Sequence, residues 1–86
     1  MNWFEKWILS KEYNKLKAGI EVIENGIIPN LIKKQKESEN GKNPLLRKPE
    51  FYQMEIEVLQ ERKLPNMKVR KETIKEKLEL AGVQFE

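Results

Sequence analysis

The chain has 86 residues, enough for one small domain and too few for separate cofactor and substrate modules. It contains no Cys, no His and no Asp, so Glu is its only carboxylate side chain. A thiolate or imidazole zinc site, a disulfide framework and a histidine proton shuttle are therefore excluded. No glycine-rich phosphate loop is present either. We expect a protein that is not an enzyme and that uses no cofactor and no metal.

Charged residues make up 36% of the chain and apolar residues 38%, a balance typical of a folded but polar domain. A chain of this length buries only about 60 to 65% of the surface that it exposes when unfolded. Its own core therefore stabilises it only marginally, and a partner's surface can supply more. We expect a homo-oligomer or a component of a larger assembly.

Residues 2–9 form an aromatic N-terminal segment that contains Trp3, Phe4, Trp7 and Ile8. On a helical wheel these side chains point nearly opposite to the apolar stripe of the following residues. Either the helix begins before Ser10 and has two apolar faces, or residues 2–9 form a separate segment that docks independently. Large aromatic residues at a chain end are typical of anchors that fill a pocket on a partner protein. Packing on the C-terminal half and insertion into a membrane surface are the alternatives. The nearby Glu5 and the lack of a basic face make the membrane the least favoured of the three.

Residues 10–36 form an amphipathic helical region, and its apolar residues follow a heptad rhythm. The positions of this seam are Leu9, Tyr13, Leu16, Ile20, Ile23 and Ile27. Ser10 is suited to cap the start of the helix, and Asn25 with Gly26 is suited to end it before Pro29. The seam either covers the domain's own core or forms an intermolecular coiled coil. Gly19 and Gly26 lie beside it, where another backbone could approach.

Residues 37–48 are predicted to form a basic loop, because they combine Gly41, Pro44 and polar side chains. Residues 49–63 then favour a helix that begins at Pro49, with Arg62 at its basic end. Strict polar and apolar alternation over residues 54–58 keeps a strand open as the alternative.

The residues around Pro65 are predicted to form a turn, because proline biases the preceding residue away from helical geometry. A last helix over residues 70–81 follows, with Thr73 and Glu76 in a capping-box pattern and Gly82 as its stop. Apolar and polar residues alternate from Val83 onward, which is typical of a short strand. This strand would pair with residues 54–58. No internal repeat is evident.

The predicted fold class is thus mainly α: one small domain over residues 1–86, with three to four helices and a long N-terminal amphipathic helix. Its C-terminal helical pair occupies residues 49–86, and a short C-terminal strand is an added option. The longest wholly apolar run, residues 7–9, is too short to span a membrane or to serve as a secretory signal. We therefore expect a cytoplasmic protein, or one located in a virion or host cytoplasm if it is viral.

Nucleic acid is the second partner to consider, because the net charge is +3 and the isoelectric point is near 9.2. Residues 31–49 hold six Lys or Arg against two Glu, and a second basic group covers residues 62–71. Candidate phosphate contacts are Lys33, Lys34, Lys36, Arg47, Lys48, Arg62, Lys63, Arg70 and Lys71. These stretches contain no aromatic residue to stack on bases, so nucleic-acid binding stays the alternative.

The sequence therefore predicts a non-enzymatic protein-protein interaction or assembly protein whose partner is another protein or a second copy of itself. The alternatives are a basic nucleic-acid-binding accessory protein and, less favoured, a peripheral membrane protein. The chain is rich in Lys, Glu, Ile and Asn and has only two Ala. This composition is typical of A/T-rich coding sources and suggests a viral or mobile-element complex.

Overall fold

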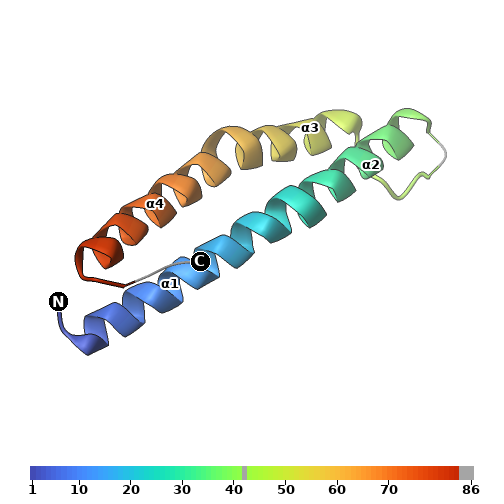
Figure 1. Cartoon of the computed structure of the whole chain (residues 1–86). Coiled ribbons are helices and arrows are strands. Elements are labelled where there is room, and N and C mark those ends of the chain that lie inside the picture. Colours follow the sequence, from blue (N-terminus) through green and yellow to red (C-terminus); the bar gives the residue numbers. More distant parts are fainter. Residues whose placement is uncertain (42, 84–86) are drawn as a thin grey trace.

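The chain forms a hairpin of two long antiparallel helical rods in the computed structural model, which describes residues 1–41 and 43–83 (Figure 1). The first rod consists of α1 (Trp3–Val22), the π-helical segment η1 (Ile23–Ile27) and α2 (Ile28–Glu39). The second rod consists of α3 (Pro49–Val58), the π-helical segment η2 (Leu59–Lys63) and α4 (Leu64–Leu80). The molecule measures 56 × 19 × 16 Å. The prediction of a mainly helical protein is confirmed, but two long helices replace the expected three or four.

The first rod begins earlier than predicted. Its N-cap is Asn2, whose side-chain oxygen accepts a hydrogen bond of 2.8 Å from the backbone N–H of Glu5. The predicted cap, Ser10, lies inside α1. Because an Asn cap and an acidic residue in the first turn both favour a helix start, the aromatic residues are part of α1 and do not form a separate segment.

Neither of the two predicted breaks ends a helix. Gly26 lies within η1, and Pro65 lies in the first turn of α4. A proline ring clashes with the carbonyl four residues before it and provides no N–H, whereas a π-helical turn shifts the bonding to the fifth residue back. The backbone N–H of Ile28 accordingly bonds the carbonyl of Ile23, and that of Leu64 bonds the carbonyl of Leu59. Each rod thus accommodates its proline by widening one turn.

Each π-helical segment adds one residue to the seam. The buried and half-buried positions of the first rod follow heptad steps up to Ile23 and then resume five residues later, at Ile28. The predicted seam residue Ile27 is 41% exposed, whereas Ile28 is 6% exposed. The prediction was wrong at Ile27 because it assumed α-helical spacing throughout, whereas the π-helical turn adds one residue before the next seam position.

The two rods contain an internal repeat that was not evident from the sequence. Residues 20–31 read IEVIENGIIPNL, and residues 56–67 read IEVLQERKLPNM. The seam positions of the first rod between residues 13 and 38 that are buried or half-buried are 13, 16, 20, 23, 28, 31, 35 and 38, and Gly19 beside the seam is half-buried as well. In the second rod the corresponding positions, each 36 residues later, are 49, 52, 56, 59, 64, 67, 71 and 74. The rods therefore use the same pattern, and the hairpin has an approximate internal twofold axis.

The core consists of two clusters. The large cluster lies around the π-helical segments and toward the loop, and its buried residues are Ile20, Ile23, Ile28, Leu31, Tyr52, Ile56 and Leu64. The small cluster lies toward the termini and consists of Tyr13, Ile74 and Leu78, with Leu9, Leu16 and Val83 packed against it. The seam predicted for the first helix therefore covers the chain's own core, except at Ile27.

The loop between the rods is fixed mainly through Arg47. Its carbonyl accepts a hydrogen bond from the hydroxyl of Ser38, its backbone N–H donates to the hydroxyl of Tyr52 at 3.2 Å, and its guanidinium bonds Glu55 at 3.2 Å. Pro49 begins α3, as predicted. The predicted loop covers residues 37–48, but α2 continues to Glu39.

The second rod ends at Gly82, as predicted. This glycine has a φ of 85°, its N–H bonds the carbonyl of Glu79, and the N–H of Val83 bonds the carbonyl of Leu78 at 2.9 Å. These two bonds define a Schellman ending. The predicted capping box is wrong, because Thr73 lies inside α4 and its hydroxyl donates to the carbonyl of Val69.

The predicted strand pairing is not formed within the described residues. Residues 54–58 belong to α3, and Val83 has no regular secondary structure. The rest of the predicted C-terminal strand, residues 84–86, lies outside the described residues. The alternation over residues 54–58 has a different cause: Ile56 faces the core as a seam residue, while Met54 and Val58 are exposed on the surface.

Candidate interaction surface

The aromatic residues of the first two turns of α1 form an exposed cluster, which we call the aromatic cluster (Trp3, Phe4, Trp7 and Ile8). The rings of Trp3 and Phe4 are edge to face with centroids 6.0 Å apart, and those of Phe4 and Trp7 are stacked at 6.1 Å. The ammonium group of Lys11 lies 4.3 Å from the ring centroid of Trp7. The rings therefore contact one another and present a joint surface.

All four residues of the aromatic cluster are exposed, from 75% for Trp3 to 44% for Ile8. Packing of these side chains on the C-terminal half was one alternative for this segment. None of the four side chains belongs to either core cluster, and each is at least 44% exposed. Contiguous exposed apolar side chains of this size mark interaction sites more often than isolated ones do.

A second apolar surface, missed from the sequence, lies between the rods near the loop end. It is a groove of about 450 Å³ whose lining consists of Ile27, Leu31, Met54, Glu55, Val58, Leu59 and Lys63. The sequence predicts a helix over residues 49–63, with a strand over residues 54–58 as the alternative, and it predicts Ile27 as a seam residue. The signal that could have revealed the groove is the repeated IEV triplet, which puts a valine beside the seam in each rod.

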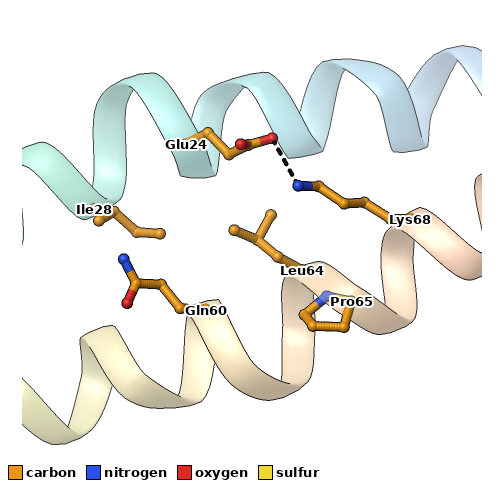
Figure 2. Close-up of a pocket in the computed structure, with 6 residues that line it drawn as sticks. All are labelled: Glu24, Ile28, Gln60, Leu64, Pro65 and Lys68. Carbon is orange, nitrogen blue, oxygen red and sulfur yellow. Dashed lines mark ion pairs between the residues drawn. The ribbon is translucent and has the colours of Figure 1, made fainter.

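A smaller pocket of about 310 Å³ lies beside the two π-helical segments (Figure 2). The repeat pairs its residues across the rods, so that Ile28 corresponds to Leu64 and Glu24 to Gln60. The Lys68 ammonium lies 3.6 Å from the Glu24 carboxylate at the rim. Both partners are largely exposed, and an exposed ion pair of this kind gives no group suited to acid or base catalysis.

The predicted phosphate contacts are not gathered on one surface. Lys33, Lys34 and Lys36 lie on α2, and Arg47 and Lys48 lie in the adjoining loop; the others, Arg62, Lys63, Arg70 and Lys71, lie on the second rod. Two of the arginines already bond carboxylates within the chain: Arg47 bonds Glu55, and Arg70 makes two bonds to Glu12 at 3.0 and 3.2 Å. The basic residues are thus divided between separate parts of the hairpin.

The paired contact between Arg70 and Glu12 ties α4 to α1 near the small cluster. The hydrogen bonds that Arg70 donates to the Glu12 carboxylate, together with the negative charge of that carboxylate, raise the pKa of the Arg70 guanidinium. Lys71, the next residue, places its ammonium 5.8 Å from the ring centroid of Tyr13. Both basic groups therefore have intramolecular partners that a phosphate would have to displace.

Within residues 1–41 and 43–83, no three acidic side chains come together in a way that could hold a metal ion. Over the same residues, no helix has both the length and the apolar character needed to cross a membrane. The arrangement offers exposed apolar surface, and we identify the aromatic cluster and the groove as the two candidate interaction surfaces.

The chain gives no match to a protein-family model, to a curated protein or to a solved structure.

Proposed function

We propose that this chain is a non-enzymatic interaction protein that binds another protein through the aromatic cluster, as a component of a larger assembly. The observation that supports this proposal is the exposure of three aromatic rings, with Phe4 packed against both Trp3 and Trp7, at one end of a hairpin whose core is formed without them. Aromatic side chains contribute most to binding when a partner buries them in a pocket, because each removes a large apolar area from water.

The surroundings of the aromatic cluster favour a protein partner over a membrane surface. Glu5 lies in the same first turns, and Lys11 places its ammonium over Trp7. An interfacial membrane helix combines an apolar face with a strongly basic polar face, whereas α1 has both signs of charge around its rings. A protein pocket with a polar rim accommodates such a mixture.

The test compares partner recovery by the unmodified chain and by the Trp3→Ala/Trp7→Ala double variant, after nuclease treatment of an extract from the native source. Phe51→Ala is the matched control, because this aromatic side chain is also exposed but lies in α3, outside the aromatic cluster. We expect the double variant to lose the partner and to keep its helical circular dichroism signal, and the control to keep both.

Three results would contradict the proposal. Loss of the helical signal in the double variant would show that the aromatic residues stabilise the fold. Recovery of nucleic acid at about 50 mM salt, with affinity falling steeply as salt rises, would favour the basic residues as the binding site. Cosedimentation of the purified chain with anionic lipid vesicles that depends on Trp3 and Trp7 would favour a membrane surface.

A further inference from the structure

One side of the hairpin, which we call the groove face, has apolar residues beside the seam on both rods. Val22 and Ile27 precede the seam residues Ile23 and Ile28, and Val58 precedes Leu59. In an α-helix, the residue just before another is rotated from it by about 100° about the helix axis, always in the same sense. Val22, Ile27 and Val58 each precede a seam residue, so all three lie on the same side of the seam in their rod. Apolar residues flanking a seam widen the apolar stripe beyond what one neighbouring helix covers.

The internal repeat extends this surface across the hairpin. A twofold axis that exchanges two antiparallel rods runs perpendicular to the plane that contains them. A rotation about this axis moves a residue to the other rod but keeps it on the same face of the hairpin. The repeat therefore places Val22 at the position equivalent to Val58, and Ala18 at the position equivalent to Met54. The groove and its counterpart on the other rod consequently form one apolar strip over the middle of the groove face.

The other face of the hairpin is more polar at the corresponding places, where Pro29, Ile32 and Pro65 are the apolar residues that follow the seam. Residues that follow the seam include Glu24 and Gln60, which follow Ile23 and Leu59, and Lys68, which pairs with Glu24. The two faces therefore differ in a way that the fold of one hairpin does not require. A difference of this kind is expected where one face is covered by a partner and the other faces water.

The exposed area of the chain is larger than that of a compact protein of its mass. The accessible surface is 6661 Å², whereas a compact monomer of 10.3 kDa exposes about 5,400 Å². The difference is roughly 1,300 Å², and a standard protein interface removes about 800 Å² from each partner. One further hairpin packed along the groove face would remove a large part of this difference.

The charges beside the groove favour a second copy as that hairpin. Glu55 and Lys63 both line the groove, and they lie eight residues apart on one rod, on the order of 12 Å along its axis. In a twofold contact the same surface of each copy faces the other in the opposite direction. Where the twofold axis runs across the rods, Lys63 of one copy meets Glu55 of the other, whose carboxylate also bonds Arg47 within its own chain, so opposite charges face each other across the contact.

We propose that two copies of this chain pack groove face to groove face and form a four-helix bundle, which buries Val22, Ile27, Met54 and Val58 between them. Antiparallel hairpins that pair in this way give each rod two neighbours, the usual arrangement in helical bundles. The aromatic cluster is not needed for this contact. The proposal therefore goes beyond the proposed function and can fail independently of it.

The experiment measures the mass of the full chain by sedimentation equilibrium across a series of protein concentrations. We expect a dimer at the higher concentrations, and we expect Val58→Lys to raise its dissociation constant at least about tenfold, because a lysine without a partner would be buried. Val69→Lys is the matched control. It puts the same side chain at a more exposed valine of the same rod, 67% against 48% for Val58, and should change the constant by less than about twofold.

Two further variants test the geometry of the contact. Val22→Lys should weaken the dimer as Val58→Lys does, because the repeat gives it the equivalent place on the other rod. Lys63→Glu should also weaken it, because this substitution places a carboxylate opposite Glu55 of the other copy. Circular dichroism of each variant shows whether the hairpin remains folded.

A monomer at every concentration would overturn the proposal. So would a dimer that Val58→Lys and Val69→Lys weaken equally, or one that only the Trp3→Ala/Trp7→Ala variant disrupts. The last result would show that the aromatic cluster, and not the groove face, joins two copies. A dimer that is lost in Val58→Lys while partner recovery through the aromatic cluster is kept would support both proposals separately.

Discussion

The two core clusters of the hairpin differ in how completely they exclude water. In the small cluster Ile74 and Leu78 are fully buried, at 0% exposure, whereas every buried residue of the large cluster retains some exposure. The large cluster is also bordered by open space, since Ile28 and Leu64 line one pocket and Leu31 and Leu59 line the groove. The cluster with fewer residues therefore has the tighter packing.

The difference between the clusters follows from the helical period. Around the small cluster both rods keep uninterrupted heptad steps, so successive seam residues interlock across the hairpin. Around the large cluster each rod contains a π-helical segment, which changes the direction of the seam by one residue. The wider turns that accommodate Pro29 and Pro65 thus leave the large cluster less completely shielded from water. They also leave apolar surface available for a partner.

The largest expected effect is in the small cluster. Leu78→Ala truncates a side chain that is 0% exposed, and it should destabilise the fold by about 2 to 5 kcal/mol. For a chain whose total stability is on the order of 5 kcal/mol, the variant should be largely unfolded at moderate temperature. Urea denaturation followed by circular dichroism measures the change.

Leu80→Ala is the matched control for Leu78→Ala. Leu80 lies two residues later in the same helix and is 90% exposed, so the same substitution should change the free energy of unfolding by less than about 0.5 kcal/mol. Equal effects at the two positions would show that the small cluster is not packed as described, and the comparison between the clusters would then fail.

The second prediction tests the change of seam position in the large cluster. Ile28→Ala should destabilise the fold by about 2 to 4 kcal/mol, whereas Ile27→Ala should cost less than about 1 kcal/mol. Urea denaturation at low protein concentration is the measurement, because self-association would add stability that depends on concentration. The reverse order would mean that the rod is an uninterrupted α-helix and that the seam continues at Ile27.

The sequence was sufficient to predict the helical class, five of the six seam residues of the first rod, the start of α3 at Pro49 and the end of α4 at Gly82. It was not sufficient to predict the hairpin. Pro65 and Gly26 were taken as breaks because each disfavours an α-helix locally, yet a π-helical turn accommodates both. Local propensity gave way here to the apolar contacts of Ile28 and Leu64, which are gained only when the rods continue.

The candidate site could be predicted only in part. The aromatic cluster was identified correctly as lying off the seam, because a helical wheel shows the direction of a side chain. The groove was missed, because its lining combines residues from both rods, such as Ile27 and Met54, that only the hairpin brings together. The repeat of residues 20–31 in residues 56–67 was the available signal for this pairing.

The smallest expected effects concern two glycines, one beside each cluster, for which the same substitution should have opposite signs. Gly82 adopts a φ of 85°, so Gly82→Ala should destabilise the ending that places Val83 on the small cluster, by about 1 kcal/mol. Gly26 has helical geometry and open space around the place of a Cβ atom. Gly26→Ala should therefore stabilise the fold by about 0.5 to 1 kcal/mol.

Thermal or urea unfolding of the two glycine variants beside the unmodified chain measures both signs in one experiment. Gly19→Ala provides an intermediate case, because its new methyl group would lie 2.9 Å from the flexible end of Met67, and the gain in helix propensity would be reduced by moving that side chain. Destabilisation by Gly26→Ala would show that the π-helical segment needs a glycine. The wider turn of the first rod would then depend on backbone freedom at Gly26 as well as on Pro29. Because the equivalent residue in the second rod is Arg62, the two π-helical segments would have different causes.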